Sequence, residues 1–129
     1  MEPTVLPSCR GLRVMIIDDD ELICDALSLF CSSHKMESVT HQTAESALRQ
    51  LKRHHFDIMF TDYSLSGMDG IAFLRAASRL APQAKKVLMT AQPDKHLMKL
   101  AYQNGADGYL QKPLTASSLQ DCLQVLMQI

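Results

Sequence analysis

The chain has 129 residues, which is the length of one globular domain. Its 13 basic and 14 acidic side chains leave a formal net charge of -1, so the composition gives no support for nonspecific binding to nucleic acid or to a membrane surface. No apolar run approaches the roughly 20 residues that span a bilayer, and the first residues lack the pattern of a secretory signal. We therefore expect a cytoplasmic protein.

The beginning of the chain differs from the rest. Residues 1–11 contain two prolines and a glycine and show no periodicity, so we expect a flexible N-terminal arm there and a single domain over residues 12–129. The apolar run RVMII at 13–17 is typical of a strand buried on both faces. Apolar residues at helical spacing then predict a helix over 20–33, and SVTH at 38–41 predicts a weaker strand.

The alternation of short strands and helices continues to the end of the chain. Thr43 is the expected cap of a second helix, strand DIMFTD follows at 57–62, and a third helix is expected to end before Pro82. A strand at 85–90, a helix at 94–104, a strand at 107–111 and a last helix capped by Thr115 complete the pattern. Five strands alternating with five helices predict an α/β fold with a doubly wound parallel sheet.

Polar residues gather at one predicted edge of this sheet. Asp18 and Asp19 follow the first strand, and Asp62 ends the third. Thr90 ends the fourth strand, and Lys112 follows the fifth. Since ligands bind at the carboxyl ends of parallel strands, and since the common order 2-1-3-4-5 places strands 1 and 3 side by side, we expect the three carboxylates to converge in one pocket.

Converging carboxylates repel one another, and a hard divalent cation relieves that repulsion. Mg²⁺ prefers oxygen ligands and is typically held by one or two carboxylates, with Mn²⁺ as an alternative ion. A metal, the Thr90 hydroxyl and the Lys112 ammonium group suit a phosphoryl group whose charge is neutralised during transfer. Asp62 has partners on both sides, so it is the predicted nucleophile. Asp20 and Asp69 are instead expected to cap helices.

Four blocks of sequence resemble the receiver domain of bacterial two-component response regulators. They are IIDDDE at 16–21, DIMFTDYSLSGMDG at 57–70, VLMTA at 87–91 and GYLQKP at 108–113. All four occur in the expected order and spacing, and the resemblance extends over about residues 12–129. It implies the flavodoxin-like (βα)5 fold with strand order 2-1-3-4-5.

The resemblance also implies a role for each matching position. Asp62 matches the phosphoacceptor, and Mg²⁺ would be held by Asp18, Asp19, Asp62 and the main-chain carbonyl of Ser64. Thr90, Ala91 and Lys112 match the residues around the phosphoryl group. Thr90 and Tyr109 match the pair that switches conformation, and Lys112–Pro113 matches a peptide bond that is usually cis in the family.

The implied function is a signalling switch. A histidine kinase or a histidine phosphotransfer protein would phosphorylate Asp62, and the face built from the fourth helix, fifth strand and fifth helix would then control a partner or an output domain. The resemblance implies no enzyme activity beyond self-catalysed phosphoryl transfer and slow autodephosphorylation, whose rate Ser64 and Gln92 would tune. It leaves homodimerisation on phosphorylation open, and it implies no direct contact of this domain with nucleic acid or membrane.

Two other function classes remain to be weighed. The first is an interaction module that works without phosphorylation, a pseudo-receiver, although the complete set of pocket residues argues against it. The second is an enzyme on the same fold, such as a Mg²⁺-dependent phosphatase or a flavin protein. DDDE follows the first strand where a flavin phosphate would want a Ser/Thr/Gly-rich loop, and the chain has no tryptophan. Whether the chain is a stand-alone receiver or part of a longer regulator stays open.

The cysteines and histidines point to no separate site. The four cysteines are scattered without a C-x-x-C motif, and no two histidines are four residues apart. Cys24, Cys31 and Cys122 fall on or beside apolar stripes, where a free cysteine behaves as a small hydrophobic residue. We expect reduced thiols that pack in the core.

Overall fold

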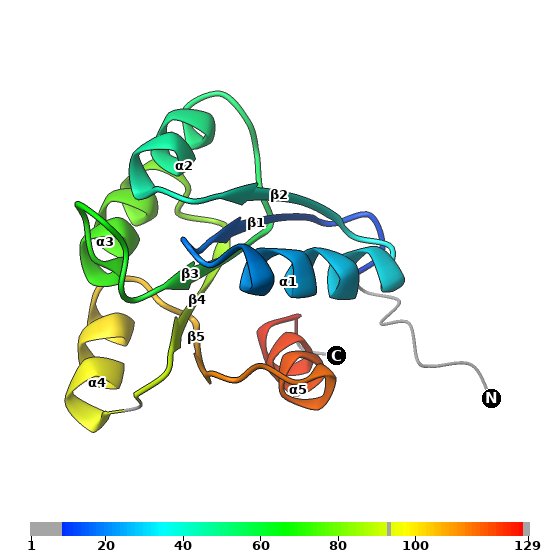
Figure 1. The fold of residues 1–129 in the computed structure, drawn as a ribbon. Helices are drawn as coiled ribbons and strands as arrows, with labels where there is room; N and C mark the ends of the chain where they lie inside the picture. The colour runs from blue at the N-terminus through cyan, green and yellow to red at the C-terminus, as the bar shows by residue number, and fades with distance from the viewer. Residues whose placement is uncertain (1–8, 93, 128–129) are drawn as a thin grey trace.

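The computed structural model describes residues 9–92 and 94–127. Five parallel strands form one sheet in the order β2-β1-β3-β4-β5, as predicted (Figure 1). The strands are β1 (Arg13–Ile17), β2 (Glu37–His41), β3 (Ile58–Asp62), β4 (Lys85–Thr90) and β5 (Gly108–Gln111). The helices are α1 (Glu21–Ser33), α2 (Ala44–Leu51), α3 (Gly70–Leu80), α4 (Lys95–Gln103) and α5 (Ala116–Met127). The α/β flavodoxin-like fold is therefore confirmed, with element ends that differ from the prediction by a residue or so.

The helices cover the sheet on both faces, with α1 and α5 on one side and α2, α3 and α4 on the other (Figure 1). Alternate side chains of a strand point to opposite faces. Val14 and Ile16 of β1 accordingly pack with α1 and α5, whereas Met15 and Ile17 pack with α2 and α3. This explains why the run RVMII shows no polar alternation, since both of its faces are buried.

The helix starts follow the expected capping chemistry. The side chains of Asp20, Thr43 and Asp69 accept hydrogen bonds from the backbone amides of Leu22, Ser46 and Ala72. Asp94 caps α4 in the same way, and Thr115 Oγ1 accepts from the Ser118 amide at the start of α5. Each cap satisfies an amide that the helix itself leaves without a partner, so it fixes where the strand-to-helix loop ends.

The expected N-terminal arm is packed against the domain at its last residues. Residues 1–8 lie outside the described part of the chain, but Cys9 is fully buried in the cluster beneath α1 and α5. The Gly11 amide donates to the carbonyl of Lys35, with Gly11 at φ +82°. Cys9 therefore anchors the end of this segment to the core, while the flexibility expected for the arm stays a prediction.

The cysteines that the structure describes are all free thiols. Cys24 and Cys31 are buried in α1 and Cys122 is half-buried in α5, as predicted from the apolar stripes. Burial raises the pKa of Cys31 to about 12, with a further increase from Cys9. These thiols are therefore protonated at neutral pH and act as core side chains.

Among the described residues, no helix is long and apolar enough to cross a membrane.

Candidate functional site

The site is built at the carboxyl end of the sheet, where β3 presents Asp62. This strand lies between β1 and β4, and its residues are buried throughout. The carboxylate of Asp62 emerges at the end of that apolar strand with only 7% of the residue exposed. The next amide, that of Tyr63, still donates to Met89 of β4 at 2.9 Å. Asp62 is thus held on a rigid element at the point where the chain leaves the sheet.

The start of α3 comes unusually close to the end of β3. The Gly70 amide donates to the carbonyl of Tyr63 at 2.7 Å, and a Cβ atom at Gly70 would lie 2.5 Å from the main-chain oxygen of Asp62. Only glycine fits this approach, because any side chain there would displace the backbone that carries Asp62. The glycine at the end of the loop 64–70 therefore sets the position of the site.

The acid pair follows β1, as predicted. Asp18 is fully buried, and its Oδ1 accepts from the Asp20 amide at 2.9 Å. Its own amide donates to His41 of β2 at 3.0 Å, which fixes the turn out of the strand. Asp19 is exposed. The buried member of the pair is therefore rigidly held, while the other faces the opening.

Asp18, Asp19 and Asp62 converge as the sequence predicts. One carboxylate oxygen from each lies within 4.8 Å of the other two. Three carboxylates at this spacing are a suitable donor set for a hard divalent cation such as Mg²⁺, which takes oxygen ligands. The exposed position of Asp19 also leaves room for the water ligands that this ion retains.

Lys112 joins the two buried carboxylates. Its Nζ lies 2.7 Å from Asp18 Oδ2 and 3.2 Å from Asp62 Oδ1. The contact with Asp62 was expected, but the shorter one with Asp18 was not. Pairing across 94 positions of sequence cannot be read from local pattern, although the Lys-Pro turn after β5 does indicate where the lysine emerges. The Lys112–Pro113 peptide bond is cis.

The electrostatics of the site favour neutralisation of its negative charge. Burial raises the pKa of Asp62 above its usual range, and the neighbouring charge of Asp18 raises it further. Lys112 and the Ser64 amide act in the opposite direction without cancelling the increase. Burial alone would lower the pKa of Lys112, but its hydrogen bonds and charge pairing with Asp18 and Asp62 raise it. One ammonium group thus serves two carboxylates, and a second cation would relieve the remaining repulsion.

The other wall of the site is formed by the end of β4. Thr90 is buried, and its Oγ1 accepts from the Gln92 amide at 3.2 Å. A cavity of about 520 Å³ extends from Asp62 and Lys112 past Thr90 to the first turns of α4. Its lining includes Ser64, Ala91, Gln92 and the side chains Tyr63, His96, Leu97 and Leu100. The predicted residues Thr90, Ala91, Ser64 and Lys112 therefore share one cavity with Asp62.

Part of that cavity was not expected from the sequence. Tyr63 and Leu100 are half-buried and pack against the apolar cluster between α3 and α4. The apolar periodicity of residues 94–104 predicts a buried face for α4, but it does not show that this face closes a cavity beside Asp62. That information depends on how α4 packs over β4.

Tyr109 lies at the edge of the same region. Its ring packs against the apolar cluster of α3 and α4, and its hydroxyl accepts from the Asp94 amide at 3.4 Å. Tyr109 is not among the residues that line the cavity next to Asp62; it lines a separate depression between β5 and α5. The ring therefore links the start of α4 to the outer surface of β5.

Two buried aspartates and one exposed aspartate converge with a bridging lysine and a strand-end threonine, and on this fold they define a receiver-type site. The family described as the response regulator receiver domain matches residues 14–124 of the chain. The chain therefore belongs to the response regulator receiver domain family.

Similarity to individual proteins agrees with this assignment. The chain is 30% identical over 114 residues to the transcriptional regulatory protein ZraR of Escherichia coli K12, which covers 88% of the chain and 26% of that protein. The chain thus spans about a quarter of the length of this curated relative. A CheY-like receiver domain protein from Methanospirillum hungatei superposes with a TM-score of 0.86 at 25% identity, covering 92% of this chain and 94% of the other.

A Burkholderia pseudomallei response regulator, solved with a phosphorylated aspartic acid, a calcium ion and citrate, shares the fold. Its TM-score is 0.83 at 22% identity, with 92% of this chain and 69% of the other covered.

Proposed function

We propose that this domain accepts a phosphoryl group on Asp62 and acts as a phosphorylation-operated signalling switch. The observation that carries the proposal is the convergence of Asp18, Asp19 and Asp62 within 4.8 Å, with Lys112 bound to two of them. Such a site combines a nucleophilic carboxylate with groups that can neutralise the charge of a phosphoryl group. The phosphorylated aspartate in the Burkholderia relative supports this chemistry.

Asp18, Asp19, Asp62 and the main-chain carbonyl of Ser64 would hold Mg²⁺, with Mn²⁺ as an alternative. When bound, the ion supplies positive charge against the oxygens of the phosphoryl group. In the transfer step, a carboxylate oxygen of Asp62 forms the new bond to phosphorus, and the bond from phosphorus to the donor histidine nitrogen breaks. The electron pair of that bond stays on the nitrogen. Lys112 and the Thr90 hydroxyl then stabilise the phosphoryl oxygens.

The donor would be the phosphohistidine of a histidine kinase or of a histidine phosphotransfer protein. The domain supplies the acceptor and the charge, so it acts as a self-catalysing phosphoacceptor rather than as an enzyme with turnover. Ser64 and Gln92, which line the cavity beside Asp62, are placed to influence how water reaches the acyl phosphate. We propose that they set its rate of hydrolysis.

The output would pass through the face made by α4, β5 and α5. Thr90 would move toward the phosphoryl group, and Tyr109 would turn toward the space that Thr90 leaves. This rotation breaks the hydrogen bond between the Tyr109 hydroxyl and the Asp94 amide at the start of α4. The same face exposes Met98, Tyr102 and Val125, which supports a role in binding a downstream protein or an output domain.

The test is phosphorylation by a small acyl-phosphate donor such as acetyl phosphate. With Mg²⁺ present, the protein should gain one phosphoryl group that is stable in acid and labile in base, and EDTA should prevent the reaction. Asp62→Asn should abolish the label, whereas Asp69→Asn, which keeps a capping side chain outside the site, should retain it. Label that persists in Asp62→Asn would overturn the proposal. Failure of the wild-type protein to react would favour an interaction module that works without phosphorylation.

A further inference from the structure

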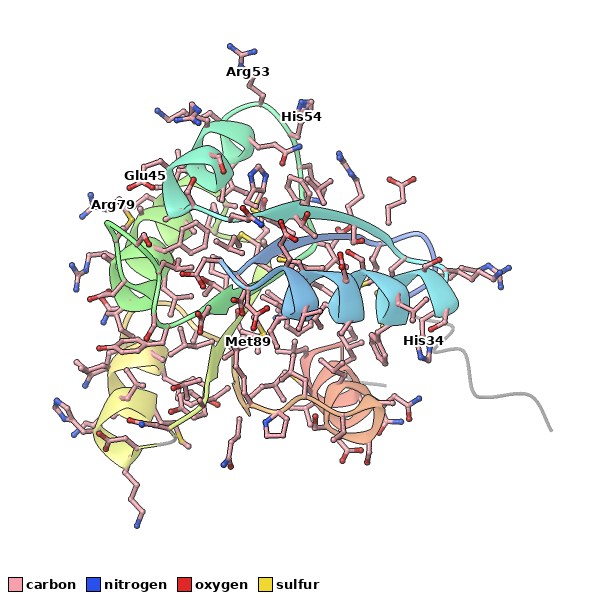
Figure 2. The ribbon with its side chains drawn as sticks, in the orientation of Figure 1. His34, Glu45, Arg53, His54, Arg79 and Met89 are labelled. Carbon is pink, nitrogen blue, oxygen red and sulfur yellow. The ribbon has the colours of Figure 1, made fainter. Side chains whose placement is uncertain are left out.

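A second charged region lies at the opposite end of the sheet, where α2 ends and the chain enters β3. The segment RQLKRHH at 49–55 has three Lys or Arg side chains, two histidines and no acidic residue. Arg49, Lys52, Arg53 and His54 are exposed. Figure 2 shows Arg53 and His54 projecting from the loop after α2, away from the body of the domain. We call Arg49, Lys52, Arg53 and His54 the basic rim.

The rim has few counter-charges of its own. In residues 9–92 and 94–127, the ion pairs nearest to it join His55 to Asp57 and Arg13 to Glu37. Arg49, Lys52 and Arg53 form no ion pair with any of those residues. The partial negative charge of a helix C-terminus favours cations in the last turn and so accounts for Arg49. Lys52 is the C-cap residue of α2, whereas Arg53 and His54 lie beyond the helix, and the helix end alone does not explain these two.

Two neighbouring depressions share this rim. One, of about 470 Å³, is lined by Ser46, Arg49, Gln50, Lys52, Arg53 and His54. The other, of about 260 Å³, has Lys52, Arg53 and His54 at its edge and Leu51, Phe56 and Leu80 among its apolar lining. No acidic residue lines either depression. The surface therefore offers positive charge around a small apolar floor, in which Leu80 is exposed whereas Leu51 and Phe56 are buried.

The combination of positive charge and a small apolar floor favours an acidic peptide over nucleic acid as the ligand. Single-stranded nucleic acid is bound by stacking bases on exposed aromatic rings, but Phe56 is buried and its ring is already covered by the Arg13 guanidinium at 4.8 Å. The rim is also too short to follow a run of backbone phosphates. An acidic peptide with one apolar side chain matches both the charge and the floor.

We propose that the basic rim and the apolar floor beside it bind an acidic segment of a partner protein. The carboxylates of that segment would pair with Lys52 and Arg53, and one apolar side chain would lie against the exposed Leu80. Because β3 runs from this end to Asp62 at the other, the partner would bind without covering the phosphoacceptor. The domain could then hold this partner and a phosphodonor at the same time.

The probe is a fluorescein-labelled peptide of eight glutamates with one central leucine, followed by anisotropy at low ionic strength. Saturable binding is expected, with the Kd rising as salt is added. Lys52→Gln/Arg53→Gln should weaken the binding by about tenfold, which corresponds to about 1.4 kcal/mol. Lys95→Gln/Lys99→Gln removes the same charge from α4 and should leave the Kd within about twofold. Thermal unfolding checks that both double variants are folded.

Two further arms test the choice of ligand. A peptide with serine in place of leucine should bind about threefold more weakly, and Leu80→Ser should remove that preference. Binding that is unaffected by Lys52→Gln/Arg53→Gln would overturn the proposal, as would the absence of saturable binding. A single-stranded oligonucleotide of equal charge that binds more tightly than the peptide would also contradict it. Asp62→Asn should bind the peptide as the wild type does, so this test is independent of phosphorylation.

Discussion

The two ends of the sheet use charge in different ways. At the carboxyl end, Asp18 and Asp62 are buried, and the half-buried Lys112 lies 2.7 Å from Asp18 and 3.2 Å from Asp62. At the amino end, Arg49, Lys52 and Arg53 are exposed on a helix end and its loop. Buried charges interact strongly and are costly to leave unpaired, whereas exposed charges are screened and can change partners. The first arrangement suits chemistry, and the second suits reversible binding.

The largest expected change in stability comes from removing the lysine that joins the two buried acids. Lys112→Ala should lower the free energy of unfolding in EDTA by about 3 to 5 kcal/mol, because it leaves Asp18 and Asp62 without their counter-charge. Mg²⁺ should restore part of this loss by linkage, since the proposed metal site exists only in the folded form. Urea unfolding with and without Mg²⁺ measures both effects. A loss in EDTA below about 1 kcal/mol would show that the buried acids do not need the lysine.

Substitutions at the adjacent residues Asp19 and Asp20 should separate the role of metal ligand from the role of helix cap. Asp19→Asn should slow phosphorylation by acetyl phosphate by about 100-fold or more at a fixed Mg²⁺ concentration, because it removes a charged ligand of the expected ion. Asp20→Asn is the matched control, because asparagine caps a helix as well as aspartate does. Its rate should stay within about twofold of wild type. Equal effects of the two substitutions would contradict the distinction between ligand and cap.

The sequence predicts the elements well and their tertiary pairing less well. Apolar runs such as RVMII and caps such as Thr43 and Asp69 act locally, so they can be read directly. The convergence of Asp18, Asp19 and Asp62 could be predicted because parallel strands share one edge. The Lys112–Asp18 contact could not, because it depends on where a flexible side chain settles between two acids.

Packing between elements explains the remaining differences. Cys9 lies in a segment without periodicity, and only the tertiary structure shows that it fills the core below α1. The apolar floor near the basic rim is likewise invisible in the sequence, because Leu51 comes from α2 and Leu80 from α3. The run KRHH indicates charge, but the fold decides what that charge surrounds.

Lys86, near the amino end of β4, is a buried charge at the same end of the sheet as the exposed basic rim. Lys86 is 3% exposed, and its Nζ donates to the carbonyls of Ala81 and Ala84 at 2.8 Å each. Lys86→Met would leave both carbonyls without this donor, so we expect the free energy of unfolding at pH 7 to fall by about 1 to 3 kcal/mol. Chemical denaturation measures the change. A variant as stable as wild type would mean that the cost of burying the ammonium group offsets its two hydrogen bonds.

The difference in stability between wild type and Lys86→Met should depend on pH with a defined sign. Burial lowers the pKa of Lys86 from its ordinary value of 10.5, and the charge of Asp107 only partly opposes this. In the alkaline window between the lowered pKa and 10.5, the unfolded chain binds more protons than the folded chain. The stability of wild type relative to Lys86→Met should therefore rise as the pH increases through that window. A relative stability that falls there would contradict the lowered pKa.

The smallest expected effect comes from the basic rim. Lys52→Gln/Arg53→Gln removes two exposed charges that form no ion pair with the residues the structure describes. The free energy of unfolding should change by less than about 0.5 kcal/mol. The rate of phosphorylation by acetyl phosphate should stay within about twofold of wild type, because the rim lies at the far end of β3. A large change in that rate would show that the two ends of the sheet are coupled.

The most direct test is to locate the phosphoryl group chemically. After reaction with acetyl phosphate and Mg²⁺, borohydride reduces an aspartyl phosphate to homoserine, and peptide mass spectrometry identifies the position. We predict homoserine at position 62 alone, and none after reaction in EDTA. Homoserine at position 18 or 19, or a phosphorylated protein without homoserine at position 62, would contradict the assignment of Asp62 as the phosphoacceptor.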